Sequence, residues 1–158
     1  MRKIEAEMCN AILSNKNFKK GNTEVEVNGN QTNVYLHGHR IATFTRNNPG
    51  NSTMEFGLCG WDSQTTKSRV KAVLNVIYHN SASIIKYDIK TKNSDVILEA
   101  INCLSGEKSC AIIDSHTRVH FDTSKGHILK LTNAYNEPVK CHKLGKTKGN
   151  EGIFAKFM

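Results

Sequence analysis

The strongest constraint on this chain is the alternation of apolar and polar residues between residues 24 and 58. Val25 and Val27 alternate with glutamates, and Asn28-Gly29 then supplies a two-residue turn of the kind that tolerates positive φ. The alternation resumes in three later runs, at residues 34–36, 41–44 and 54–58. A period of two places every second side chain on the same face of a strand. The pattern therefore predicts an antiparallel β meander with one face toward solvent.

Helical periodicity flanks this meander on both sides. Apolar residues recur at helical spacing in two stripes, the first at Ile4, Met8 and Ile12 and the second at Val70, Val73, Leu74 and Ile77. A third stripe, between Val96 and Leu104, follows Ser94 as a possible cap and stops before Gly106, so the pattern predicts a third helix there. The expected fold is α+β: an antiparallel meander with a leading amphipathic helix and a following helix, then a second α+β half.

The boundary between the two halves lies near residue 81. We expect a helix–β meander–helix lobe at residues 1–80 and a second α+β lobe at residues 84–158 with a basic C-terminal segment, or one continuous domain that contains both. The chain has 158 residues, which is enough to bury a core without disulfides or metal.

Several protein classes are excluded by composition. No apolar run approaches the roughly 18 residues that a membrane-spanning helix needs, and the first seven residues lack the apolar core of a signal peptide. The five cysteines are an odd number with no CxxC spacing, which favours reduced thiols. We therefore expect a soluble protein of a reducing compartment that does not bind a membrane.

Positive charge is the main functional signal. The formal net charge is +8, and two groups of cations stand out, one at the start of the second helix and one near the C-terminus. Lys67, Arg69 and Lys71 lie off the apolar stripe, so we expect the first turns of that helix to present positive charge to solvent and to an anion. The C-terminal group consists of Lys140, Lys143, Lys146 and Lys148. Together these residues predict nucleic-acid binding through phosphate contacts, to DNA or RNA.

Aromatic side chains favour a different partner. A surface built from Tyr35, Trp61, Tyr78 or Tyr135 would suit a protein target, because buried aromatic anchors dominate the energy of protein–protein interfaces. Trp61 is also able to stack on a base, although filling the junction between the sheet and the following helix is the favoured interpretation.

Histidines supply the only catalytic hypothesis. His116 and His120 would share a strand face with Asp114 and Asp122 if residues 114–122 formed one strand, and such a group could support a nuclease. The same alternation describes the solvated face of an ordinary strand, which is the favoured interpretation. His37 and His39 bracket a glycine in an expected turn and lack further ligands at zinc spacing. We expect no metal, no cofactor and no catalytic site.

Two sequence motifs in the first half of the chain resemble those of a known protein family. Residues 35–42 read Tyr-Leu-His-Gly-His-Arg-Ile-Ala, and residues 61–69 read Trp-Asp-Ser-Gln-Thr-Thr-Lys-Ser-Arg. Over roughly residues 1–80 the chain resembles a family of small proteins of tailed bacteriophages. The resemblance implies a viral origin and a life in the cytoplasm of the bacterial host, and it implies no particular activity. The alternatives that it leaves open are a nucleic-acid-binding protein, an inhibitor of a host transcription, replication or defence factor, and a virion component.

Overall fold

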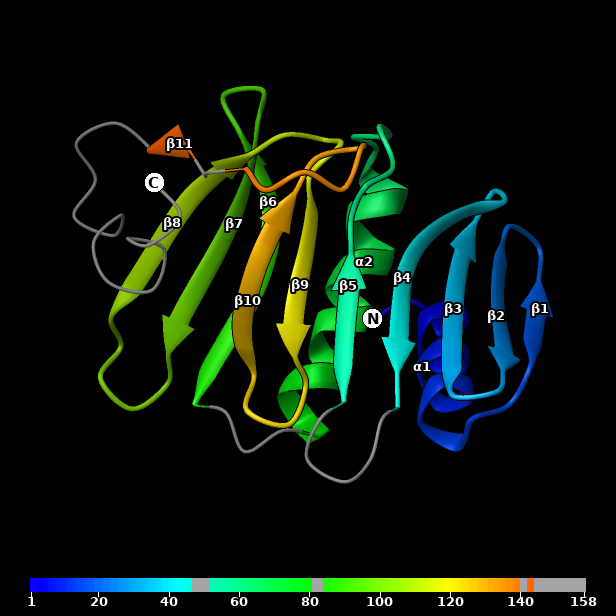
Figure 1. Cartoon of the computed structure of the whole chain (residues 1–158). Helices are drawn as coiled ribbons and strands as arrows, with labels where there is room; N and C mark the ends of the chain where they lie inside the picture. The colour runs from blue at the N-terminus through cyan, green and yellow to red at the C-terminus, as the bar shows by residue number, and fades with distance from the viewer. Residues whose placement is uncertain (47–51, 81–83, 140–141, 144–158) are drawn as a thin grey trace.

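The computed structural model describes residues 1–46, 52–80, 84–139 and 142–143 (Figure 1). The elements in chain order are α1 (Lys3–Ser14), β1 (Phe18–Lys20), β2 (Thr23–Asn28), β3 (Gln31–Leu36), β4 (His39–Thr45), β5 (Thr53–Phe56), α2 (Gln64–Asn80), β6 (Ile85–Lys92), β7 (Asp95–Asn102), β8 (Lys108–Ile113), β9 (Arg118–Asp122), β10 (His127–Thr132) and β11 (His142–Lys143). Two helices combined with antiparallel sheets confirm the predicted α+β class.

The strands form two antiparallel sheets. The larger sheet has seven strands in the order β1-β2-β3-β4-β5-β9-β10, and the smaller has four in the order β11-β8-β7-β6. Both helices lie behind the larger sheet in Figure 1, and β6 of the smaller sheet packs there too, since the Tyr87 and Phe121 ring centroids are 4.8 Å apart. The larger sheet therefore has one covered face and one open face.

The meander predicted at residues 24–58 is confirmed as strands β2 to β5. Gly29 has φ +60°, and the turn at His37 and Gly38 has φ +51° and +77°, so both tight turns use the left-handed conformations that the sequence indicated. Strand β1, which pairs with β2 at the sheet edge, was not predicted.

Both predicted amphipathic helices form and bury their stripes, except that Ile4 is only half-buried. Met8 and Ile12 of α1 are buried, as are all four apolar positions of the α2 stripe. Helix α2 contacts α1 on one side and strands β4 and β6 on others. It is therefore covered over more of its circumference than a single stripe would require. No helix in the described residues is long and apolar enough to span a bilayer.

The prediction of a third helix is wrong. Residues 95–102 form strand β7, which pairs with β6 on one side and β8 on the other. Asn93 and Ser94 both have positive φ, so Ser94 belongs to a tight hairpin turn and caps no helix. Residues 96–100 are buried on both faces of the strand, and all of them except Glu99 are apolar. Periodicity cannot distinguish such a run from a helix stripe.

The two predicted lobes contribute strands to the same sheet. β5 pairs with β9, with Met54 opposite Phe121 and Phe56 opposite Val119. The buried apolar side chains of the described residues, with the exception of Ile97, form one cluster that includes both halves of the chain. The four described cysteines are free thiols, and Cys141 lies outside the described residues.

Candidate functional site

The cations at the start of α2 are engaged in internal ion pairs. Arg69 and Glu5 are 3% and 2% exposed, and Arg69 Nη1 lies 2.7 Å from Glu5 Oε2. Arg69 Nε also donates to Thr23 Oγ1 at 3.0 Å. This guanidinium therefore ties α2 to α1 and to β2.

Lys67 and Lys71 are paired as well. Lys67 is buried, with Nζ 2.7 Å from Asp62 Oδ1 and a further hydrogen bond to Thr91. Lys71 is exposed, and its Nζ lies 3.7 Å from Asp88 Oδ1. The expectation that all three present their charge to solvent is thus wrong for Lys67 and Arg69, because α2 is also covered by α1 and β6.

The C-terminal lysines fall outside what the structure describes. Lys140, Lys146 and Lys148 are beyond the described residues, and Lys143 lies in β11 without a described side chain. Their part in nucleic-acid binding stays a prediction.

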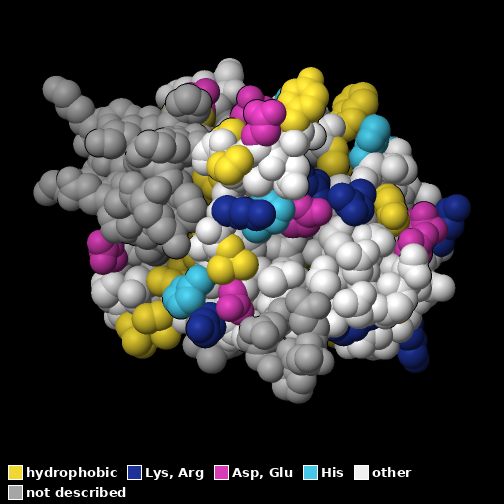
Figure 2. All heavy atoms as spheres, viewed as in Figure 1, with side chains coloured by type: hydrophobic (Ala, Val, Ile, Leu, Met, Phe, Trp, Pro, Cys, Tyr) yellow, Lys and Arg dark blue, Asp and Glu magenta, His cyan; other side chains and the backbone are white. Residues whose placement is uncertain are grey.

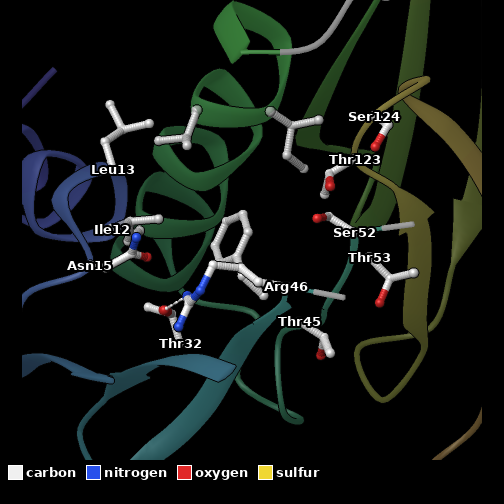
Figure 3. A pocket seen from close by; sticks show the side chains of 13 residues that line it. Ile12, Leu13, Asn15, Thr32, Thr45, Arg46, Ser52, Thr53, Thr123 and Ser124 are labelled. Atoms are coloured by element: carbon white, nitrogen blue, oxygen red, sulfur yellow. Dashed lines mark hydrogen bonds between the residues drawn. The ribbon is translucent and has the colours of Figure 1, made fainter. Parts of the chain in front are cut away.

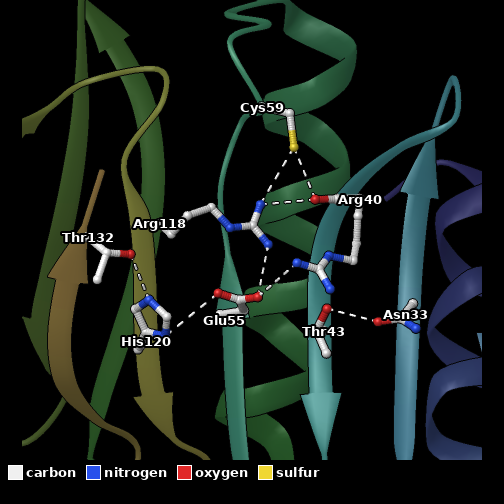
Figure 4. A network of polar contacts seen from close by, with 8 residues as sticks. All are labelled: Asn33, Arg40, Thr43, Glu55, Cys59, Arg118, His120 and Thr132. Carbon is white, nitrogen blue, oxygen red and sulfur yellow. Dashed lines mark hydrogen bonds and ion pairs between the residues drawn. The ribbon is translucent and has the colours of Figure 1, made fainter. Parts of the chain in front are cut away.

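A polar cluster that the sequence did not indicate occupies the open face of the larger sheet (Figure 4). Glu55 of β5 lies at its centre. Its Oε1 is 3.4 Å from Arg40 Nη2 and 3.5 Å from Arg118 Nη2, and its Oε2 is 3.7 Å from His120 Nδ1. One carboxylate is thus shared by two guanidinium groups, so the cluster carries a net positive charge even with a neutral imidazole.

Backbone and thiol contacts hold Arg118 in place across the sheet. Its Nη1 donates to the Arg40 carbonyl oxygen at 2.9 Å and lies 3.5 Å from Cys59 Sγ. The Cys59 thiol donates to the same carbonyl at 3.0 Å. The Arg118 side chain passes close to Gly57, where no Cβ could be accommodated. A Cβ there would lie 2.9 Å from Arg118 Cδ and 2.8 Å from the Thr117 carbonyl oxygen.

Burial shapes the chemistry of this cluster. It lowers the pKa of His120, and Lys130 and Arg118 lower it further against the opposing effect of Glu55. Burial also raises the pKa of the Cys59 thiol. His120 is therefore neutral at neutral pH, and Cys59 is a protonated thiol rather than a nucleophilic thiolate. The contacts suit electrostatic binding of an anion better than covalent chemistry.

The cluster borders a surface cavity of about 560 Å³. Its lining residues include both arginines, Glu55 and Cys59, together with His39 and His116. Gly60, with φ +82°, leaves room for His116, since a Cβ at this position would lie 2.7 Å from His116 Cε1. Figure 2 shows lysine and arginine side chains gathered across the middle of this face, with histidine and acidic side chains between them.

The histidines proposed for a nuclease do not share a strand. His116 lies in a turn before β9, where its backbone N–H donates to Asp114 Oδ1 at 2.7 Å, whereas His120 lies within β9. Asp122 accepts hydrogen bonds from the backbone of the following turn. Among the described residues, no group of three or more His, Cys, Asp or Glu side chains is placed to hold a metal ion. The shared strand face on which the nuclease hypothesis depended is absent, because residues 114–117 turn.

The aromatic candidates have different surroundings. Trp61 is 57% exposed and lies 5.6 Å from the His39 ring, so the interpretation that it fills the sheet–helix junction is wrong. Tyr135 is 83% exposed. Tyr35 is half-buried opposite Arg40 in the β3–β4 register, and Tyr78 on α2 donates to Cys103 Sγ at 3.4 Å.

A second cavity of about 430 Å³ lies beside the first. Its walls are Trp61, apolar side chains of β3, β4 and the segment after β5, and hydroxyl groups near the start of α2. His39 lines both cavities. The exposed tryptophan is therefore adjacent to the cavity that the two arginines border.

Sequence reasoning missed Arg40, Glu55 and Arg118 as a group. Each occupies a solvent-side position of a strand, and that signal was available in the alternation. Their convergence depends on the pairing of β5 with β9, which joins segments more than sixty residues apart. No local pattern specifies that pairing.

Fold and site define this chain as a small α+β protein with a net-positive polar cluster on the open face of its larger sheet. The family described as the Kyanoviridae Gp96 protein matches residues 1–103, so the chain belongs to this phage protein family. This confirms a bacteriophage family, as the resemblance over residues 1–80 implied. Neither a curated protein nor a solved structure matches the chain.

Proposed function

We propose that this phage protein is non-catalytic and binds nucleic acid, DNA or RNA, in the bacterial host cytoplasm, mainly through phosphate contacts on the open face of the larger sheet. The observation that carries the proposal is the sharing of Glu55 by Arg40 and Arg118 at the edge of an open cavity. Guanidinium groups suit phosphate because their planar N–H donors match two phosphate oxygens.

Charge along the face supports this assignment. The Arg40 side chain is 48% exposed, so its guanidinium can turn from Glu55 to a phosphate without unfolding the strand. Lys130 is exposed and lies opposite His120 in the β9–β10 register, on the same face as the arginines. Arg40, Arg118 and Lys130 lie on β4, β9 and β10, within four neighbouring strands of the sheet. Cations spaced in this way fit a linear polyanion better than a single small anion.

Aromatic groups at the rim favour single strands over duplexes. Trp61 is exposed beside His39, where an unpaired base can stack on the indole ring. Bases of a duplex are already stacked and paired, so this contact is open only to a single strand.

Salt-dependent binding tests the proposal. Fluorescence anisotropy with a labelled single strand of about 20 nucleotides should give binding at about 50 mM salt that weakens steeply by about 200 mM. Arg40→Gln should weaken binding and reduce the slope of log K against log salt by about 0.7, the value for one phosphate contact on a single strand. Absence of binding to single and double strands at the lower salt would refute the proposal.

Lys71→Gln is a matched control for the site. Lys71 is 45% exposed and paired with one carboxylate, so this variant removes a cation of the same kind as Arg40 from a different surface. A site on the open face predicts that Lys71→Gln leaves affinity unchanged, whereas the phosphate contact that the sequence predicts for Lys71 would make the variant bind more weakly. Equal losses in the Arg40 and Lys71 variants would therefore contradict a binding site confined to the open face. Replacing Lys140, Lys143, Lys146 and Lys148 with glutamine tests the predicted C-terminal contribution in the same assay.

A host-protein target is the second candidate. The exposed rings of Trp61 and Tyr135 favour it, because large aromatic side chains in contact with water are typical anchors of protein interfaces. A stoichiometric partner recovered from nuclease-treated host lysate, and lost with Trp61→Ala, would support an inhibitor of a host factor over nucleic-acid binding.

A further inference from the structure

A third cavity, of about 330 Å³, lies where α1, α2 and the ends of several strands of the larger sheet meet (Figure 3). We propose that it binds a small organic anion, with an apolar body and one carboxylate or phosphate group. The described residues that line this site are all different from those that line the cavity bordered by Arg40 and Arg118, and the inference does not depend on the proposed function.

One side of the cavity is apolar. Buried Ile12 and Ile77 contribute to it from the two helices, and Phe44 contributes from β4. Leu13 lies at the rim and is exposed, so a ligand body in the cavity would cover a side chain that now contacts water. These surfaces suit an aliphatic or aromatic group.

Arg46 is the feature that selects an anion. Its Nη1 donates to Thr32 Oγ1, a fully buried hydroxyl, and its Nη2 donates to the Gly29 carbonyl oxygen at 2.9 Å. Neutral acceptors thus orient the guanidinium without neutralising it. Within the described residues no carboxylate forms an ion pair with Arg46, in contrast to Arg40, Arg69 and Arg118. Its remaining N–H donors are available to a ligand.

The rest of the polar side consists of neutral donors. Hydroxyl groups line it at Thr45, Ser52, Thr53, Thr123 and Ser124, and Figure 3 shows the last four of these across the cavity from Ile12 and Leu13. Hydroxyls can donate to the oxygens of an anion, and none of the described residues that line the cavity is acidic. Its volume lies at the small end of the range for ligand pockets, which excludes a large cofactor.

Three probes with nearly the same alkyl tail separate the contribution of the negative head group from that of the apolar body: decanoate, decyl phosphate and decanol. Isothermal titration of the full chain should show binding of at least one of the two anions, with decanol at least tenfold weaker. Arg46→Gln should weaken that anion at least tenfold and leave decanol unchanged. Binding of neither anion, or equal binding of anion and alcohol, would overturn the proposal; the stronger anion identifies the preferred head group.

Two variants of Leu13 test the proposal if Arg46→Gln fails to fold. Leu13→Gln and Leu13→Glu change an exposed rim position and remove the same apolar contact. Only the glutamate brings a negative charge to the cavity, so Leu13→Glu should weaken anion binding severalfold more than Leu13→Gln and should leave decanol affinity equal in both. Equal anion affinities in the two folded variants would contradict an anion site. Arg40→Gln should leave all three probes unaffected, since Arg40 does not line this cavity.

Discussion

Replacement of Glu5 by glutamine should destabilise the protein far more than an ordinary substitution in a first helical turn. Glu5 lies in the first turn of α1, yet it is 2% exposed and accepts three hydrogen bonds. The donors are the backbone N–H of Arg2, the hydroxyl of Ser68 and the guanidinium of Arg69. Glutamine keeps the shape and some of these bonds, but it leaves the Arg69 charge buried without a counter-ion.

The expected loss follows from that uncompensated charge. Removing one partner of a buried ion pair costs about 3–5 kcal/mol. Because glutamine still accepts a hydrogen bond and Arg69 retains Thr23 as a partner, we expect about 3 kcal/mol. For a chain of this size that loss lowers Tm by about 6–12 °C. It is a large share of the roughly 5–15 kcal/mol by which most domains are stable.

Urea unfolding followed by circular dichroism measures this loss. The control is Glu7→Gln on the same helix. Glu7 pairs with Lys20 at 3.1 Å, but the two side chains are 31% and 54% exposed, so the cost should stay below about 1 kcal/mol. The double variant Glu5→Leu with Arg69→Met should recover most of the loss, since apolar replacement of a whole buried pair is often neutral. A Glu5→Gln loss no larger than that of Glu7→Gln would refute the reasoning.

Two further predictions concern acid stability and a glycine. The pKa of His120 is lowered from 6.5 and that of Glu5 from 4.5, so both groups stabilise the fold above these values and lose their contribution as pH falls through each folded-state pKa. Melting curves should therefore show a first decline below about pH 6.5 that His120→Gln removes, and a second below about pH 4.5 that Glu5→Gln reduces. Gly60→Ala should lower stability by about 1–3 kcal/mol in urea unfolding, because φ is +82° and the added Cβ meets His116; a neutral result would mean that the His116 loop is free to move.

Local patterns predicted the first half of the fold well. Alternation at Val25 and Val27 together with a turn at Asn28-Gly29 determines strand, turn and facing side chains within a few residues, and the structure confirms the meander. The same reasoning failed at residues 96–104. Consecutive buried residues such as Val96, Ile97 and Leu98 show no alternation with a period of two, and Ser94, which indicates a helix cap in the sequence, lies in a hairpin turn.

The candidate site was predicted poorly for a different reason. Charge on a helix is presented to solvent only where no other element covers it, and the sequence does not say that α1 and β6 cover the start of α2. Lys67 and Arg69 consequently form internal ion pairs with Asp62 and Glu5. The cluster around Glu55 could not be predicted because it needs the pairing of β5 with β9.

That pairing also determines how the cluster relates to the family. Arg40, Glu55 and Cys59 lie within the residues that the family matches, whereas Arg118 and His120 lie beyond residue 103. Without β9, strand β5 would be an unpaired sheet edge, and Glu55 would face one guanidinium, which gives a neutral pair and no net attraction for an anion. The positive charge of this face is therefore a product of the C-terminal strands, and an anion-binding role requires the whole sheet rather than the matched segment alone.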